Sequence, residues 1–322
     1  MKSKIVVGID IGGTNTAFGF VDRSGKLLSE SSIPTHPQES AEQLLRRLEP
    51  EIKKLLSSLP TNYELAGIGI GAPNANYYKG TVELPPNLNW GIVNLVELTG
   101  KYFSVPCAIT NDANAAAIGE LKFGAGKNLK DFIVITLGTG VGSGIIVNGE
   151  LVYGHDGFAG EIGHTIYDVD GRQCGCGRRG CLETYASANG IKRTVFELLA
   201  ETNFPSVLSK ISFDELTAKM ISDAALSGDK IALMAFDKTA KILGIKLADT
   251  VAHTSPQAII LFGGLAKAGG LILEPTKKYM EEYMLNIFKD KVQLLPSGLE
   301  NGNAAILGSA ALIWNEIDKQ NK

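Results

Sequence analysis

The sequence lacks the features of membrane, secreted and nucleic-acid-binding proteins. Its 322 residues carry a formal net charge of −3, without the dense run of Lys and Arg that would favour a polyanion. It has no stretch of about 18 apolar residues that could cross a bilayer. Its first residues lack the basic and apolar regions of a secretory signal. These absences favour a cytoplasmic protein with no nucleic-acid partner and no membrane partner.

Cysteine is scarce, yet three of the four cysteines lie within eight residues, at Cys174, Cys176 and Cys181. One of only four histidines, His164, precedes them. One histidine and three thiolates make a closed tetrahedral ligand set for a structural Zn²⁺, although the Cys-x-Cys step is tighter than zinc-finger spacing. A disulfide is the alternative, but three clustered cysteines cannot all pair with one another and a reducing cytosol opposes it. The stretch therefore predicts structural zinc.

Two segments of the chain share one pattern of strand, glycine turn, strand, turn and strand. In the first, an apolar strand over residues 4–9 leads into a turn over 10–15. In the second, a strand over 132–136 leads into a turn over 137–144, and Asn148-Gly149 marks a later hairpin. A repeat at this distance indicates a duplicated domain core rather than a solenoid.

The remaining segments alternate between strand and helix patterns, which predicts the α/β class. Because the chain is longer than one core normally serves, we expect two lobes, and the absence of a Pro/Ser-rich linker suggests that they share a cleft. Pro50 is expected to break or kink its helix, and Ser212 to Glu215 reads as a capping box. Expected helices cover residues 39–59, 113–123, 230–252, 271–287 and 304–317, and expected strands 65–70, 105–110, 258–262 and 292–295.

The two glycine turns are candidate phosphate-binding segments, because backbone N–H groups in such turns can cradle phosphate. A plain hairpin is the alternative for either turn alone, and neither matches a P-loop. Asp10, at the end of the first strand, is the expected outer ligand of Mg²⁺. A G-x-G-x-x-G pattern occurs at Gly175, Gly177 and Gly180, but it follows no strand, so we reject it as a dinucleotide fingerprint.

Asn111-Asp112 stands between an expected strand and an expected helix. One interpretation of Asp112 is a helix N-cap. The other is a general base, because ligands in open α/β sheets sit at the carboxyl ends of strands. A carboxylate there could accept the proton of a substrate hydroxyl, as the catalytic-loop Asp of protein kinases does.

Four motifs together resemble the signature of the ROK family (repressors, open reading frames and sugar kinases). They are DIGGT at 10–14, LGTGVGSG at 137–144, EIGH at 161–164 and CGCGRRGCLE at 174–183. They fall in the family's order, and the resemblance covers essentially the whole chain. GAP at 71–73 and LPPNLNW at 84–90 resemble sugar-contact segments of the glucokinase branch, although Asn74 stands where many such members carry glycine.

The resemblance implies a two-lobed actin-like, Hsp70-like fold of the ribonuclease H type, with a cleft between the lobes. The expected small lobe covers 1–118 plus 303–322, and the large lobe covers 119–302, with the zinc knuckle at 161–183. ATP would lie between the glycine turns, and a homodimer or a dimer of dimers is implied. The implied nucleotide and Mg²⁺ residues are Asp10, Gly12, Gly13, Thr14, Asn15, Gly138, Thr139, Gly140, Gly263 and Gly264.

The resemblance also implies ATP-dependent phosphorylation of a hexose, with glucose the leading substrate and its 6-hydroxyl the acceptor in carbohydrate metabolism. Asp112 would be the base, and His164 would give one ring nitrogen to zinc and the other to a sugar hydroxyl. The implied sugar contacts are Gly71, Asn87, Asn111, Asp112, Glu161, His164 and Glu183.

Three alternatives remain within this resemblance. The first is a kinase of N-acetylglucosamine, N-acetylmannosamine or fructose. The second is a sugar-sensing repressor, which would need an N-terminal helix-turn-helix domain that a strand starting by residue 4 leaves no room for. The third is a sugar-binding protein without catalysis, which intact Asp10 and Asp112 oppose. Cys107, in an apolar strand, is expected to be a core residue and not a metal ligand.

Overall fold

The computed structural model describes residues 2–299 and 304–320, and the chain divides into two compact units. The first unit comprises Met1–Asn128, Gly149–Ala159 and Gly298–Lys322, and the second comprises Leu129–Asn148 and Gly160–Ser297. The expected lobe boundary at 118/119 stays a prediction, and the one at 302/303 lies outside the described residues. Among the described helices, none combines the length and apolar character needed to cross a membrane.

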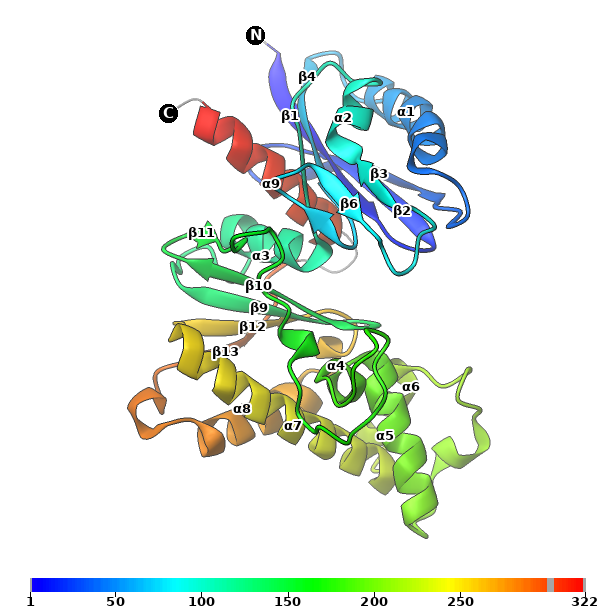
Figure 1. The fold of residues 1–322 in the computed structure, drawn as a ribbon, viewed down its shortest axis with the longest axis vertical. Coiled ribbons are helices and arrows are strands. Elements are labelled where there is room, and N and C mark those ends of the chain that lie inside the picture. The colour runs from blue at the N-terminus through cyan, green and yellow to red at the C-terminus, as the bar shows by residue number, and fades with distance from the viewer. Residues whose placement is uncertain (1, 300–303, 321–322) are drawn as a thin grey trace. The chain divides into compact units, whose positions relative to one another are not determined.

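The first unit is built on a five-stranded sheet with the order β3-β2-β1-β4-β8 (Figure 1). β1 pairs antiparallel with β2 and parallel with β4, and β4 pairs parallel with β8. The parallel strands β1 and β4 are buried along most of their length after the first residues, which explains their continuous apolar runs. The strands are β1 (Ser3–Ile11), β2 (Asn15–Val21), β3 (Leu27–Pro34), β4 (Tyr63–Gly71) and β8 (Cys107–Thr110).

Helices pack on this sheet because glycines let them approach closely. A Cβ at Gly69 of β4 would lie within 1.8 Å of the Ser309 carbonyl oxygen of α9, so only glycine fits there. α1 carries the capping box of Ser40 and Gln43 and runs unbroken through Pro50, so of the expected break or kink the break is wrong and the kink stays a prediction. The helices of this unit are α1 (Ala41–Ser57), α2 (Leu95–Gly100), α3 (Asp112–Phe123) and α9 (Ala304–Gln320).

A small three-stranded sheet, which sequence patterns did not predict, extends the first unit beyond β4. Its strands are β5 (Ala75–Asn76), β6 (Thr81–Glu83) and β7 (Ile92–Asn94), in the order β5-β6-β7. The segment Gly149–Ala159 joins the same unit. Tyr153 stacks on Tyr77 with ring centroids 4.1 Å apart, and the buried Asn76 amide donates to the Asp156 carbonyl at 2.7 Å.

Within the second unit, the strand order β10-β9-β12-β13 repeats the order β2-β1-β4-β8 of the first. β9 pairs antiparallel with β10 and parallel with β12, which pairs parallel with β13, as β1, β2, β4 and β8 do. The expected duplicated core is therefore confirmed. Asn148 and Gly149 both have positive φ, at 53° and 77°, as a tight hairpin turn requires. The strands of this unit are β9 (Phe132–Leu137), β10 (Val141–Val147), β12 (Ala258–Phe262) and β13 (Gln293–Pro296), whereas β11 (Glu150–Leu151) lies in the segment Gly149–Ala159 of the first unit.

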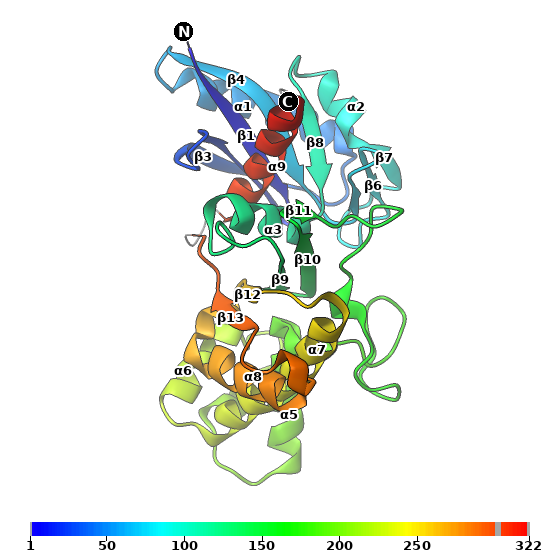
Figure 2. The same cartoon turned by 90° about the vertical axis from the view of Figure 1, so that its left-hand side faces the viewer.

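Helices of the second unit gather on its sheet (Figure 2). The long helix α7 is apolar on most sides and packs against α5, α6 and α8 in one buried cluster. The expected boundaries of α7 and β12 hold to within two residues. The helices are α4 (Glu183–Ala186), α5 (Ala188–Glu201), α6 (Ala218–Leu226), α7 (Lys230–Thr254) and α8 (Gly270–Tyr283).

Two local expectations need correction. The Glu215 carboxylate does accept hydrogen bonds from the Ser212 N–H and hydroxyl, but no helix follows, and α6 begins at Ala218 under a Thr217 cap. The second glycine turn is also shorter than expected, because Val141 already starts β10. Only Gly138 to Gly140 form the turn, and Gly142 and Gly144 lie in the strand, paired with β9.

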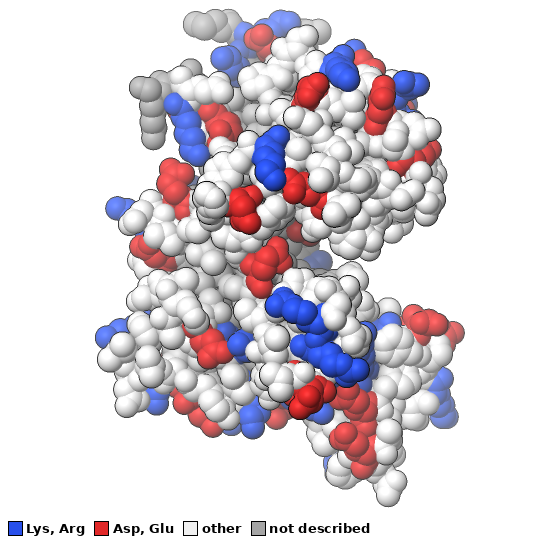
Figure 3. Space-filling view, viewed as in Figure 1, with Lys and Arg blue, Asp and Glu red and all other residues white. Residues whose placement is uncertain are grey.

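Surface charge on the face shown in Figure 3 is mixed, with Lys and Arg interspersed among Asp and Glu. That face therefore presents no extended field of one sign, in keeping with the modest net charge of −3.

Candidate functional site

Parallel pairing in the first unit aligns the ends of three strands. Asp10 of β1 pairs in register with Gly71 of β4, which pairs with Thr110 at the end of β8. Asn111 and Asp112 follow directly and begin α3. Carboxyl ends of parallel strands form the ligand-binding edge of α/β sheets, and Asp10, Gly71, Asn111 and Asp112 share one such edge.

Asn111, and not Asp112, caps α3. The Asn111 Oδ1 atom accepts from the Asn114 N–H at 2.7 Å, and Asp112 is the first residue of the helix. The N-cap interpretation of Asp112 is therefore wrong, and its carboxylate accepts from the neighbouring Ala113 N–H at 2.9 Å and from its own backbone N–H. Asn111 keeps its amide N–H₂ group as a donor.

Burial and mutual repulsion shape the two carboxyls. Burial, and then the charge of Asp112, raise the pKa of the Asp10 carboxyl from 3.8 to about 6. Burial also raises the pKa of Asp112, against the lowering effect of its backbone hydrogen bonds. The Asp112 side chain nevertheless keeps contact with solvent. Two neighbouring carboxylates with raised pKa values suit a bound cation, which would favour their charged forms.

The first glycine turn lies next to this pair. Its backbone is fixed by Thr35, whose hydroxyl donates to the Gly12 carbonyl at 2.8 Å and whose N–H donates to the Thr14 carbonyl at 2.8 Å. A Cβ at Gly13 would lie 2.9 Å from the Asn87 Cβ, so the turn and the predicted sugar residue Asn87 touch. Asn15, predicted as part of the turn, begins β2.

In the second unit, the other glycine turn is held from two sides. The Gly138 carbonyl accepts from the Ala188 N–H at the start of α5, at 2.8 Å. Gly263, with φ at 105°, lies so close to Leu137 that a Cβ would meet its carbonyl oxygen at 2.7 Å. The predicted nucleotide residues Gly138 to Gly140, Gly263 and Gly264 thus follow adjacent strands β9 and β12.

Glu183, the first residue of α4, faces the same turn. Its Oε2 atom accepts from the Val141 N–H at 3.0 Å, and a Cβ at Gly140 would lie 2.3 Å from that oxygen. Its Oε1 atom lies 3.7 Å from Cys174 Sγ. The carboxylate therefore stands where the glycine turn and the cysteine cluster meet.

Glu161 and His164 flank one short 3-10 turn, Ile162–His164. This turn packs directly on β10, because a Cβ at Gly163 would lie within 1.9 Å of the Val141 carbonyl oxygen. The predicted sugar residues Glu161, His164 and Glu183 therefore all border the start of β10.

The predicted zinc ligands come together. The donor atoms of His164, Cys174, Cys176 and Cys181 all lie within 4.8 Å of one another. Cys174 Sγ lies 3.7 Å from His164 Nδ1, and Cys176 Sγ lies 3.7 Å from Cys181 Sγ. A tetrahedral zinc with bonds of about 2.3 Å to sulfur separates its donors by about 3.8 Å, so the residues present fit the metal.

The chemistry of the donors also fits a cation. Burial raises the pKa of the Cys176 thiol, but backbone and side-chain hydrogen bonds from Arg178 outweigh it and lower that pKa to about 6. Burial raises the pKa of Cys174 and of Cys181, which a bound metal would reverse by stabilising the thiolates. Cys107 lies outside the cluster and packs against the core of the first unit, as expected, although it is only half-buried.

Sequence reasoning missed Arg172, whose guanidinium joins the cysteine segment to Glu197 of α5 and to α4. An arginine next to the glycine and cysteine run was the available signal, but nothing in the sequence indicates its partners.

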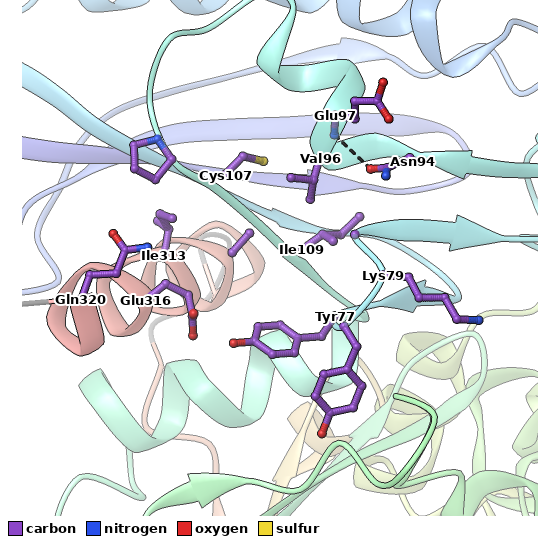
Figure 4. A pocket seen from close by; sticks show the side chains of 14 residues that line it. Tyr77, Lys79, Asn94, Val96, Glu97, Cys107, Ile109, Ile313, Glu316 and Gln320 are labelled. Atoms are coloured by element: carbon purple, nitrogen blue, oxygen red, sulfur yellow. Dashed lines mark hydrogen bonds between the residues drawn. The ribbon is translucent and has the colours of Figure 1, made fainter.

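A pocket with a volume of about 560 Å³ lies elsewhere in the first unit, beside the outer strand β8. Figure 4 shows Tyr77 near the end of α9, where Ile313 and Glu316 line the pocket, with Cys107 and Ile109 of β8 across from them. No predicted sugar or nucleotide residue is among its described lining residues. We therefore assign the candidate site by side-chain chemistry and not by cavity size.

Comparisons with known proteins agree with this assignment. The ROK family model matches residues 6–316. A curated glucokinase of Halalkalibacterium halodurans is 34% identical, covering 100% of this chain and 98% of that protein. A xylose repressor of Caldicellulosiruptor bescii is 32% identical, covering 97% of this chain and 78% of the repressor.

A crystal structure of a ROK family glucokinase from Streptomyces griseus, in complex with glucose and AMPPNP, superposes with a TM-score of 0.82. It is 35% identical in sequence and the match covers 96% of this chain and 98% of that one. The duplicated sheets are those of the actin-like ATPase fold, which ROK sugar kinases share. The match across residues 6–316 and the full-length similarity to these relatives show that the protein belongs to the ROK family.

Proposed function

We propose that this protein is an ATP-dependent hexose kinase that phosphorylates glucose at its 6-hydroxyl. The observation that carries the proposal is Asp112, a carboxylate at the end of β8 that is released from helix capping and lies beside Asp10. Relatives named as glucokinases share about a third of the sequence over its full length, and one is known in complex with glucose and AMPPNP.

Asp112 acts as the general base. It accepts the proton of the sugar 6-hydroxyl as that oxygen attacks the γ-phosphorus in line, while the bond to the β,γ-bridging oxygen breaks and ADP leaves. Burial raises the pKa of Asp112, which makes its carboxylate a stronger proton acceptor than an ordinary carboxylate.

The two glycine turns bind the phosphates of ATP through their backbone N–H groups. Thr35 in the first unit, and Ala188 and Glu183 in the second, hold these turns in place. Asp10 is the residue that would hold Mg²⁺, through water, and the cation would neutralise charge on the phosphates.

Sugar hydroxyls are bound by Asn87, Asn111, Glu161, His164 and Glu183. His164 turns Nδ1 toward Cys174, which leaves Nε2 for a hydroxyl. The zinc ion would be held by His164 and the three cysteines, and it would order this loop without taking part in the reaction. Cytoplasmic location, a role in glycolysis and a homodimer or dimer of dimers belong to the same proposal.

A second function, sugar sensing without phosphoryl transfer, is favoured by the 32% identity to a xylose repressor. Among kinases, N-acetylglucosamine, N-acetylmannosamine and fructose are the rival substrates. Each would need a pocket whose polar groups match its own substituents, because an unpaired buried polar group costs affinity.

A coupled assay of ADP release across glucose, mannose, fructose and the two N-acetylhexosamines tests the proposal. We expect glucose to give the highest kcat/KM. Asp112→Asn should lower kcat by about 10³-fold, within the range for loss of a general base, while glucose affinity stays within about threefold. Asp214→Asn, an exposed carboxylate of the second unit, is the matched control and should keep full activity.

Absence of ADP release with every sugar, together with sugar binding, would favour the sensor. Near-normal turnover by Asp112→Asn would remove Asp112 as the base. A higher kcat/KM for another sugar would change the substrate but not the reaction.

A further inference from the structure

Arg172 uses every donor of its side chain inside the second unit. Nε and Nη2 donate to the two Glu197 carboxylate oxygens at 2.8 and 2.6 Å, and Nη2 also donates to Thr194 Oγ1 at 2.9 Å. Nη1 donates to the carbonyl oxygens of Thr184 and Gly190 at 2.6 and 3.0 Å. A guanidinium has five N–H groups, so none is left for a substrate.

The Arg172 side chain is buried, with only 10% of it exposed. Its guanidinium lies 4.5 Å from the centre of the Tyr185 ring, and the Arg172 backbone N–H donates to the Tyr185 hydroxyl at 3.1 Å. This planar, fully bonded arrangement cannot be reproduced by lysine, which has a compact ammonium group. Arg172 is therefore a buried residue that cross-links neighbouring helices, and not a surface charge.

One chain of contacts connects Arg172 to the glycine turn through α4. Arg172 binds the carbonyl of Thr184, the second residue of that helix. The residue before it, Glu183, accepts from the Val141 N–H directly after the turn and lies against Gly140. A shift of α4 would therefore move the carboxylate that fixes one end of the turn.

A second chain of contacts connects Arg172 to the turn through α5. Arg172 binds the carbonyl of Gly190 in the first turn of that helix. Ala188, at the start of the same helix, donates its N–H to the Gly138 carbonyl at 2.8 Å. Both ends of the Gly138 to Gly140 turn are thus held by backbone elements that Arg172 binds.

We propose that Arg172 is a positioning residue for nucleotide binding. It holds α4 and the start of α5 so that the turn presents its N–H groups to the phosphates of ATP. The proposal rests on the function given above, which makes the turn a phosphate cradle. A residue that only stabilised the fold would change the melting temperature and leave the nucleotide affinity of the folded protein unchanged.

Calorimetric binding of AMPPNP and of glucose to Arg172→Lys tests this role. We expect AMPPNP to bind about tenfold more weakly, the loss expected for one charge-assisted hydrogen bond. Glucose should also bind more weakly, because the Glu183 carboxylate that would shift is a proposed sugar contact, so AMPPNP affinity is the deciding measurement. Unchanged AMPPNP affinity in the folded variant would overturn the proposal.

Arg193→Met is the matched control. Arg193 is exposed and its Nη1 donates to the Gln173 carbonyl at 3.1 Å, so it ties the same segment to α5 without binding Thr184 or Gly190. This variant should keep both affinities. A loss of AMPPNP affinity as large as that of Arg172→Lys would show that any charge removed nearby has the same effect, and would overturn the proposal.

If Arg172→Lys does not fold, Glu197→Gln decides the question. It weakens two of the five hydrogen bonds but leaves both carbonyl contacts, so AMPPNP should bind about threefold more weakly. Lys238→Met removes the other partner of Glu197, at 3.4 Å, and should leave the affinity unchanged. Unchanged AMPPNP affinity in Glu197→Gln would overturn the proposal.

Amide hydrogen exchange separates this inference from the proposed function. The Val141 and Ala188 N–H groups, bonded to Glu183 and Gly138, should exchange faster in the Arg172 or Glu197 variant than in the unaltered protein. Failure of the unaltered protein to bind AMPPNP would defeat the kinase proposal. Amide exchange would still test whether Arg172 holds the turn in place. Unchanged exchange at both amides would overturn the inference.

Discussion

At the scale of the residue, the charged form of Asp10 destabilises the folded protein. Its folded-state pKa of about 6 lies above the value of 3.8 expected for an unfolded chain. Between these values the folded protein binds more protons than the unfolded chain, so the free energy of unfolding falls as pH rises through this window. The charged carboxylate therefore costs stability above pH 6, which a residue kept only for packing would not do.

Asp10→Asn should raise the melting temperature at pH 8, because it removes a charge that costs up to about 3 kcal/mol. At pH 4 the gain should vanish, since the carboxyl is then protonated in the folded protein. Thermal unfolding at the two pH values checks this, with Asp214→Asn as the exposed control. A variant equally destabilised at both pH values would contradict the assignment of the raised pKa, and loss of kinase activity is expected at either.

At the scale of the element, the cysteine segment is expected to fold around zinc. Metal analysis of the unaltered protein should find about one Zn²⁺ per chain. Cys176→Ser should lose that metal and weaken glucose binding more than AMPPNP binding, because His164 carries both a zinc-facing and a sugar-facing nitrogen. The thiol outside the cluster provides the control, since Cys107→Ser should retain zinc and both affinities. A metal-free protein of full activity would refute the zinc assignment.

The sequence predicted those elements whose own residues determine them. β12 and α7 carry unbroken apolar patterns between clear caps, and Asn148-Gly149 can form few turns other than a tight hairpin. Prediction failed where the local signal is short. The bond between Ser212 and Glu215 closes a turn and not a helix, and the strands β5, β6 and β7 have only 2, 3 and 3 residues, too few to show an alternating pattern.

In the candidate site, some residues can be recognised in the sequence and others cannot. The cysteines and glycines are recognisable because their chemistry is local, whereas the roles of neighbouring residues depend on geometry. Only the coordinates show that Asn111 caps α3 and frees Asp112, or that Arg172 reaches α4 and α5. Both depend on a choice of hydrogen-bond partner that adjacent residues of similar type cannot reveal in sequence.

At the scale of the whole molecule, each unit has a separate buried cluster. Leu48 of α1 belongs to the cluster of the first unit and Leu243 of α7 to that of the second, and both side chains are fully buried. A chain with two cores departs from two-state unfolding when the cores differ in stability. We therefore expect calorimetry without ligands to give a van't Hoff enthalpy below the calorimetric enthalpy.

Single cavities should then separate the two transitions. Leu48→Ala and Leu243→Ala each remove a buried side chain at a cost of about 2–5 kcal/mol, and each should lower only the transition of its own unit. Leu226→Ala, whose side chain is 73% exposed, should lower neither. One transition with equal enthalpies, shifted alike by both core variants, would mean that the units unfold as a single cooperative body. The outcome also decides how ligand effects are interpreted, because a ligand stabilises only the cooperative unit to which its binding is linked.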